Sequence, residues 1–132
     1  THIWHVAVEQ FPNYWINGVG INAFDKIYQT YPEDFKIHDY VYHTHMHILD
    51  VAIETGIIGL MLYLCLILYL LWRIFMAEEG NEWLIVAFLA LMPLNSHAGI
   101  FQGDWLPVVW VSLSVAIFKS ARRDVLKIFF SH

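Results

Sequence analysis

The feature that most constrains the fold is a long apolar run near the middle of the chain. Residues 46–75 contain no proline, and residues 56–72 carry no charged side chain. At a rise of 1.5 Å per residue, a helix of ~30 residues is ~45 Å long, whereas the hydrocarbon core of a bilayer is ~30 Å thick. We therefore predict a membrane-spanning helix that projects about two turns above the membrane and carries Asp50 and Glu54 there.

Composition extends this prediction to the rest of the chain. Of the 132 residues, 58% are hydrophobic and 14% are charged, whereas soluble domains average about 25% charged residues. A chain this short cannot bury that much apolar surface in its own core, so lipid or other protein must cover it. The predicted fold class is an all-α integral membrane protein. Its membrane region, residues 51–118, is expected to hold three transmembrane helices at about 55–75, 83–99 and 101–118, the second of them broken by Pro93.

The segment before the apolar run, residues 1–50, is predicted to lie outside the membrane. Residues 2–11 place apolar side chains at helical spacing, which predicts an amphipathic helix that stops at Pro12. A second short amphipathic helix is expected over residues 23–31. Residues 32–45 are polar and aromatic without a helical period, and we interpret them as loop.

The basic residues predict the orientation. Lys26 and Lys36 fall on one side of a three-span arrangement, and the other five fall on the opposite side: Arg73, Lys119, Arg122, Arg123 and Lys127. Cytoplasmic loops carry the excess of Lys and Arg in membrane proteins. Residues 1–50 are therefore expected outside, on the periplasmic face, and the basic tail of residues 119–132 in the cytoplasm.

Four histidines lie within ten residues at the expected membrane surface: His38, His43, His45 and His47. Three interpretations are open from spacing alone. Histidine suits general acid–base chemistry because its unperturbed pKa is near neutrality. His43 and His47 also have a spacing suited to a metal site, with Asp50 and Glu54 following on the helix. The third interpretation is a polar interfacial loop that binds nothing.

Three smaller features accompany the histidines. Glu54 near the hydrocarbon edge needs a polar partner, whereas the glycines at 56 and 59 are typical of close helix packing. The sequence Gly18-Val19-Gly20 is a weak phosphate-loop signal, because the third glycine and the Walker lysine are missing. Residues 95–99 (NSHAG) either line a cavity or form a turn satisfied by its own side chains.

Taken together, these segments resemble the C-terminal part of the bacterial O-antigen ligase and polymerase superfamily. The resemblance covers nearly the whole chain in four motifs, carried in order by Trp4; by Gly18, Gly20 and Phe24; by His43-Thr44-His45 with Glu54, Gly56 and Gly59; and by Pro93, Asn95, Gly99, Phe101 and Trp110. Two departures are visible. Met46 stands where the family usually has asparagine, and the family arginine expected four residues before Trp4 would fall ahead of Thr1.

The resemblance implies metal-independent glycosyl transfer at the periplasmic face of the bacterial inner membrane, with no cofactor. The donor would be a glycan on undecaprenyl diphosphate, and the acceptor a sugar hydroxyl of the lipid A core or of a lipid-linked glycan. His45 would be the base, and His43 and Glu54 would orient it or bind acceptor hydroxyls. The implied substrate-binding positions are Trp4, Gly18, Gly20, Asn95 and His97. Further N-terminal spans of the same protein and membrane lipid are the expected partners, no nucleic acid is expected, and this part alone should be inactive.

Other classes of function are also compatible with the sequence. One is a membrane subunit that binds a metal or haem through His43, His45 and His47. Another is a protein O-glycosylating relative that uses Ser or Thr hydroxyls as acceptors. A third is a structural membrane protein whose loop only packs against partners.

Overall fold

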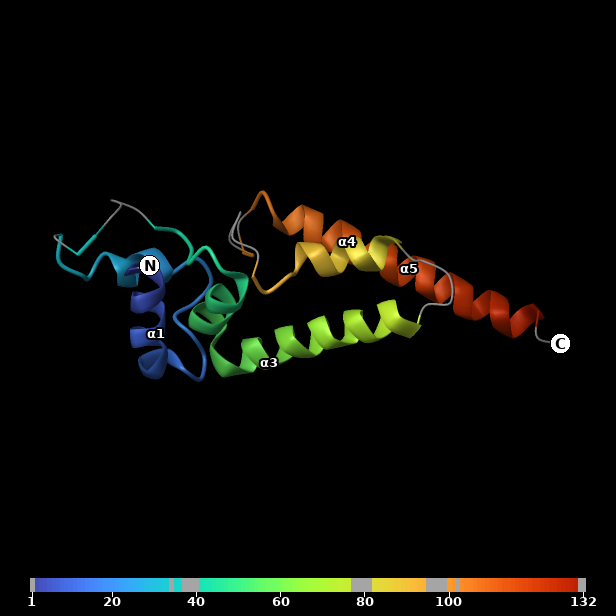
Figure 1. The fold of residues 1–132 in the computed structure, drawn as a ribbon, viewed down its shortest axis with the longest axis horizontal. Helices are drawn as coiled ribbons and strands as arrows, with labels where there is room; N and C mark the ends of the chain where they lie inside the picture. The colour runs from blue at the N-terminus through green and yellow to red at the C-terminus, as the bar shows by residue number, and fades with distance from the viewer. Residues whose placement is uncertain are drawn as a thin grey trace.

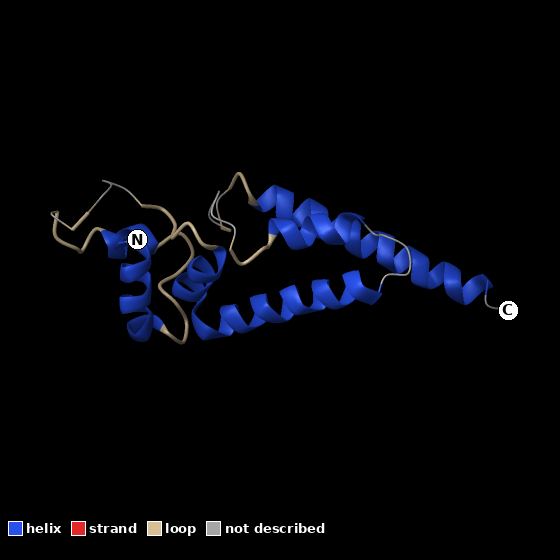
Figure 2. Cartoon of the chain, viewed as in Figure 1, coloured by secondary structure: helices blue, strands red, loops and turns tan. Residues whose placement is uncertain are grey.

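A computed structural model describes residues 2–33, 35–36, 41–76, 82–94, 100–101 and 103–130, with side chains as far as residue 122. All regular structure in these ranges is helical (Figures 1 and 2), so the predicted all-α class is confirmed. The helices are α1 (His2–Tyr14), α2 (Phe24–Tyr28), α3 (His47–Met76), α4 (Glu82–Ala90) and α5 (Leu106–Phe130).

The structure has two regions that differ in shape and composition. We call residues 2–56 the head and residues 57–122 the stem. In the head, α1 and α2 pack against the first turns of α3, at the end of the molecule where the N-terminus lies. In the stem, α4 packs against both α3 and α5, and the rest of α3 extends away from the head alongside them (Figure 1).

Within the described residues, α3 is the one helix that is long and apolar enough to cross a membrane. The second and third spans stay predictions. α4 has nine residues and is therefore about 14 Å long, less than half of a bilayer core. It ends at Ala90, before Pro93, and the rest of the predicted second span includes residues 95–99, which lie outside the described ranges. α5 runs on without a break through the predicted tail as far as Phe130.

The bounds predicted for the two short helices need correction. α1 continues past Pro12 to Tyr14, because a proline in the last turn removes one backbone bond and the chain needs only two more residues to finish the turn. α2 is five residues long and ends at Tyr28, three residues earlier than predicted. Its side chains Phe24 and Tyr28 are fully buried, so packing against the head decides its extent rather than its own periodicity.

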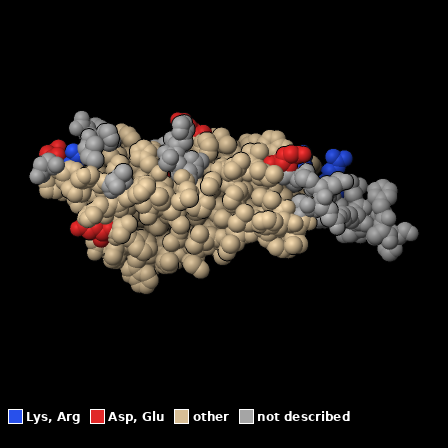
Figure 3. All heavy atoms as spheres, in the orientation of Figure 1, with Lys and Arg blue, Asp and Glu red and all other residues tan. Residues whose placement is uncertain are grey.

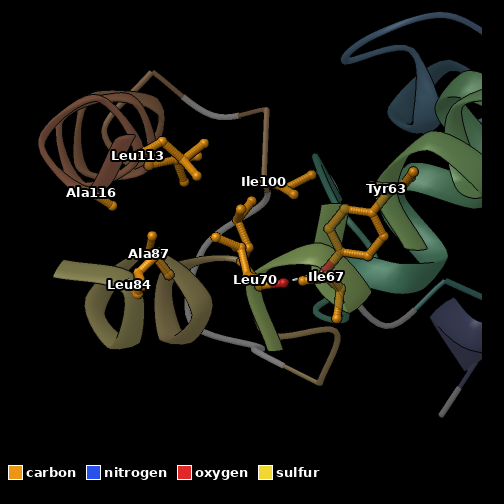
Figure 4. Close-up of a cluster of buried hydrophobic side chains, with 12 residues drawn as sticks. Tyr63, Ile67, Leu70, Leu84, Ala87, Ile100, Leu113 and Ala116 are labelled. Atoms are coloured by element: carbon orange, nitrogen blue, oxygen red, sulfur yellow. Dashed lines mark hydrogen bonds between the residues drawn. The ribbon is translucent and has the colours of Figure 1, made fainter. Parts of the chain in front are cut away.

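The stem is held together by apolar side chains from three helices. Tyr63, Ile67 and Leu70 of α3 meet Leu84 and Ala87 of α4 and Leu113 and Ala116 of α5 (Figure 4). Ser112, which is buried beside them, donates its hydroxyl to the Val109 carbonyl one turn back. The outer surface is apolar as well, and large exposed side chains include Leu62, Leu68, Trp72, Phe75, Trp110, Ile117 and Phe118.

The charged side chains are distributed unevenly along the long axis of the molecule. Figure 3 shows charged side chains toward both ends and an acidic group at the upper edge between them, with a broad uncharged face below. Lys119 pairs with Glu82 at 3.7 Å at the end of the stem that also carries Arg73 and Arg122. An apolar belt between two polar ends is the expected surface of a protein in lipid. The apolar α3 and this surface indicate a membrane protein.

Carbonyl groups at the end of α4 and just after it accept hydrogen bonds from both the stem and the head. The Trp105 indole N–H donates to the Ala90 carbonyl at 2.9 Å, and the Tyr63 hydroxyl donates to the Leu91 carbonyl. The Pro93 carbonyl accepts the Ile48 N–H at 3.1 Å, in the first turn of α3. Since the last carbonyls of a helix have no partner within it, these contacts satisfy them and bring the Pro93 segment to the head.

Candidate functional site

The site is built around a break in α3 at Gly56. Its φ is +67° and its ψ is −164°, which is a backbone conformation that residues with a side chain rarely adopt. The break releases the backbone groups that a continuous helix would pair. Buried backbone groups are almost always satisfied, so another segment must supply their partners.

The glycine loop of residues 15–20 supplies those partners. The Val19 and Gly20 amides donate to the Ile53 and Glu54 carbonyls at 2.9 and 3.0 Å. In return, the Ile57 amide donates to the Trp15 carbonyl at 2.7 Å. These backbone amides are therefore used within the protein and do not form a free phosphate cradle.

Both glycines at this crossing are required by close backbone contact. A Cβ on Gly18 would lie 2.2 Å from the backbone of Glu54, and one on Gly56 would lie 2.3 Å from the Ile16 carbonyl oxygen. Gly18 and Gly20 also have positive φ angles, of +70° and +102°. The second and third family motifs thus meet backbone to backbone, which their separation by more than thirty residues does not reveal.

Glu54 lies immediately before the break and points its carboxylate into the head. It is 3% exposed, and its Oε2 accepts the Asn22 backbone N–H at 2.9 Å. Asn22 has a positive φ of +56°, and this conformation turns its amide toward the carboxylate. The partner that Glu54 was expected to need is therefore the loop after the second glycine.

Thr44, between the two motif histidines, is held from several directions. It is fully buried. Its carbonyl accepts the Trp4 indole N–H at 2.8 Å. Its N–H donates to Asp50 Oδ1 at 2.6 Å, and its hydroxyl lies 2.8 Å from the same oxygen. Trp4 therefore contacts the histidine loop directly, although it was expected to bind substrate.

His43 and His45 project from the two sides of Thr44 and meet each other. Their ring centroids are 4.1 Å apart with an edge-on arrangement, and His43 Nδ1 accepts the His45 backbone N–H at 3.1 Å. His45 has a left-handed backbone with φ of +58° and an exposed side chain. Burial, and then the neighbouring His45, lower the pKa of the His43 imidazole below its usual value of 6.5. His43 is therefore expected to be neutral at pH 7, with Nδ1 as an acceptor and its proton on Nε2.

His47 does not join this pair. It is fully buried at the start of α3, with its ring centroid 6.5 Å from that of Trp105. Within the described residues, no three His, Cys, Asp or Glu side chains converge in a way that suits a metal ion.

The polar groups of the head line one small, shallow hollow. Its lining comes from the segments that carry the second, third and fourth motifs: Asn22, Tyr42, His43, Asp50, Glu54, Ile100 and Phe101. Asp50 Oδ2 is buried there without a hydrogen-bond partner among the described residues. The exposed His45 lies beside this hollow through its contact with His43. The arrangement offers an accessible imidazole next to two buried carboxylates, which suits proton transfer from a hydroxyl.

Comparison with protein families identifies the head. Residues 1–64 match the family model described as O-antigen ligase. The predicted superfamily is confirmed over this part of the chain. The match contains three of the four motifs and the complete Gly56 crossing. Comparisons with curated proteins and with solved structures find no match.

The structure places most, but not all, of the residues that the O-antigen ligase resemblance singled out. Asn95 and His97, and also His38, lie outside the described residues. Trp110 is 63% exposed on α5, whereas Trp105 makes the contacts with α4 and His47. Sequence reasoning missed the roles of Thr44, Asp50 and Asn22. Only the acidic residue at position 50 had a signal, as a carboxylate close to the membrane.

Proposed function

We propose that this chain forms the outer-face catalytic part of a membrane glycosyltransferase that moves a glycan from undecaprenyl diphosphate to a hydroxyl acceptor. One observation carries the proposal. His43 and His45 are paired beside the buried Glu54, within the segment that matches the O-antigen ligase family. The acceptor would be a sugar of the lipid A core or of another lipid-linked glycan.

In the proposed reaction, the imidazole of His45 takes the proton from the acceptor hydroxyl. The acceptor oxygen attacks the anomeric carbon of the donor, and the bond from that carbon to the phosphate oxygen breaks. The electron pair leaves with undecaprenyl diphosphate, which is a good leaving group already. The main requirements are therefore a base and cations for the diphosphate.

The described residues supply the first requirement. His45 is exposed and has His43 at its side, while the buried Glu54 lines the same hollow as His43. Apart from His43, none of the described residues that line the hollow is basic. The cations for the diphosphate would come from other parts of the full-length protein, and arginine is the side chain best suited to bidentate phosphate contacts.

We also propose that the head is periplasmic and that the stem lies in the bacterial inner membrane as part of a multi-pass protein. The basic residues support this orientation. Arg73, Lys119 and Arg122 lie at the end of the stem remote from the head. Donor and acceptor would then approach His45 from the outer leaflet.

A ranked set of variants in the full-length protein tests the base. His45→Ala should reduce transfer by roughly 10²–10⁴-fold while membrane insertion is unchanged, because that is the usual contribution of a positioned base. Glu54→Gln should give an intermediate loss, His47→Ala a smaller one and His38→Ala almost none. Transfer would be measured as glycan attached to acceptor per amount of inserted protein. Equal behaviour of the His45 and His38 variants would remove the special role of His45.

The metal or haem alternative predicts a different response. If His43, His45 and His47 bound a metal, chelation would abolish transfer by the full-length enzyme and one divalent metal would restore it. The positions of these side chains do not favour this alternative, because His47 is buried against Trp105 rather than facing the other two. Transfer that is unchanged in EDTA is the expected result.

A further inference from the structure

We infer that Asp50 is a positioning residue, which holds the His43–His45 pair in its working geometry through Thr44. The inference rests on the proposed function, because it takes His45 as the base. Asp50 contacts neither imidazole in a hydrogen bond. Its effect on the reaction would pass through the residue that separates the two histidines.

The contact between Asp50 and Thr44 is short and shielded from solvent. Asp50 is 2% exposed and Thr44 is fully buried. A single carboxylate oxygen, Oδ1, accepts the Thr44 backbone N–H at 2.6 Å and lies 2.8 Å from the Thr44 hydroxyl. A hydrogen bond shielded from solvent is electrostatically stronger than one in water, so these two contacts to one oxygen are well suited to fix a backbone.

The carboxylate is itself anchored in a rigid part of the molecule. The Asp50 backbone N–H donates to the Met46 carbonyl at 3.0 Å, and the Ile48 backbone N–H in the same turn donates to the Pro93 carbonyl at 3.1 Å. The other end of this part of α3 is fixed by the glycine loop at Gly56. Asp50 therefore links the histidine loop to a segment that is held at both ends.

This link fixes the backbone on each side of Thr44. Asp50 holds the N–H of the peptide that joins His43 to Thr44, and Trp4 holds the carbonyl of the peptide that joins Thr44 to His45. His45 then has the left-handed φ of +58°, which is uncommon for a residue with a side chain and persists only when its surroundings impose it. The direction of the His45 side chain thus depends on both contacts.

The contact between Asp50 and Thr44 also compensates for the departure from the family pattern at Met46. The usual asparagine at that position has a side chain that can form hydrogen bonds, and methionine does not. In this chain the Thr44 hydroxyl lies 3.0 Å from the Met46 carbonyl and 2.8 Å from Asp50. Thr44 and Asp50 together therefore supply the polar contacts next to His45 that a methionine at position 46 cannot supply.

Four variants of the full-length enzyme test this inference. Thr44→Val and Asp50→Asn should each lower kcat by roughly 10–100-fold with little change in KM, because small misplacement of a catalytic group costs about that much. Thr44→Ser keeps the hydroxyl and should stay within about threefold of the parent. Thr30→Val is the matched control, since the Thr30 hydroxyl bonds only to the Ile27 carbonyl at an exposed position, and it should be silent.

Two further measurements separate positioning from loss of folded protein. In a His45→Ala background, Asp50→Asn should cost less than about twofold more, because the two residues act through the same step. The rate at which diethyl pyrocarbonate modifies His43 and His45 in inserted protein, read by mass spectrometry, should change several-fold in Asp50→Asn and not in Thr30→Val.

The outcomes distinguish the role of His45 as the base from the positioning role of Asp50. A silent His45→Ala overturns the proposed function and this inference with it. If His45→Ala abolishes transfer but Thr44→Val and Asp50→Asn keep the parental kcat, the base stands and the positioning role is wrong. Losses that are fully additive with His45→Ala, or unchanged modification rates, show that Asp50 only stabilises the fold and also overturn the inference.

Discussion

The head and the stem satisfy their buried groups by different means. The head buries Thr44, His47, Asp50 and Glu54, and its segments cross through paired backbone groups at Gly56. Among the described residues of the stem, the buried side chains are apolar apart from Ser112, which bonds to its own helix, and the Tyr63 hydroxyl, which donates to the Leu91 carbonyl. Polar contacts are directional and costly to leave unmade, whereas apolar packing tolerates exchange of similar side chains. The head is therefore the region where one geometry is specified.

The surfaces of the two regions differ in the same sense. The head exposes polar groups, such as the His45 imidazole and the acidic side chain of Glu9, together with apolar side chains such as Ile21, whereas most of the stem exposes large apolar side chains such as Leu68 and Phe75. The stem surface would be unfavourable in water, so it is expected to contact lipid or other membrane helices. A head with buried polar contacts and a stem with an apolar surface are consistent with the proposed enzyme at a membrane surface.

The largest expected effect concerns the side of the membrane on which the head and the far end of the stem lie. In a Cys65→Ser background, a cysteine at Gln29 should react with an impermeant thiol reagent in intact spheroplasts, and a cysteine at Ser120 should not. After the membrane is permeabilised, both should react. The reverse pattern in intact spheroplasts would place the head in the cytoplasm and overturn the proposed orientation.

A substitution at the backbone crossing should break the head alone. Gly56→Ala places a Cβ 2.3 Å from the Ile16 carbonyl oxygen at a φ of +67°, so we expect a loss of about 3 kcal/mol in stability. Gly103→Ala is the control, because a Cβ there meets no atom within 4 Å. Thermal unfolding of the two purified full-length variants in detergent measures the difference. Equal midpoints would mean that the crossing is not formed.

A pair of leucines in α3 tests how the stem is covered. Leu70 is 2% exposed and packs against α4 and α5, so Leu70→Ala should cost about 2–4 kcal/mol. Leu68 is 65% exposed, and Leu68→Ala should change stability by no more than about 0.5 kcal/mol. The same unfolding assay applies. A large loss at Leu68 would show that other protein, rather than lipid, covers this face.

The smallest expected effect is a pH dependence that belongs to His43. Because burial and His45 lower the pKa of His43 in the folded state, the unfolded state binds a proton first as the pH falls. The stability that His43 contributes is therefore complete above its unfolded pKa of about 6.5 and is lost as the pH drops below that value. Unfolding midpoints at pH 7.5 and 5.5 should differ less for His43→Gln than for the parent. An identical difference in both proteins would contradict the lowered pKa.

Periodicity predicted the all-helical class and the start of α3, whereas it placed the ends of the short helices poorly. The start of α3 at His47 lies within a residue of the prediction, because the apolar run continues over many turns. Pro12 did not stop α1, and α2 is shorter than its apolar pattern suggests. Burial of Phe24 and Tyr28 limits α2, whereas Pro12 costs α1 only one backbone bond in its last turn.

The sequence by itself determined the all-helical class, the apolar length of α3, and the resemblance to the O-antigen ligase family through Gly18, His45 and Glu54 in their order along the chain. Only the tertiary structure decided how these motifs meet. The break at Gly56, the return of the glycine loop to fill it, and the hold of Asp50 on Thr44 all join residues through backbone hydrogen bonds and close approaches. Such contacts have no signature in residue type or spacing, because every residue carries the same backbone groups and only the folded chain selects which of them pair.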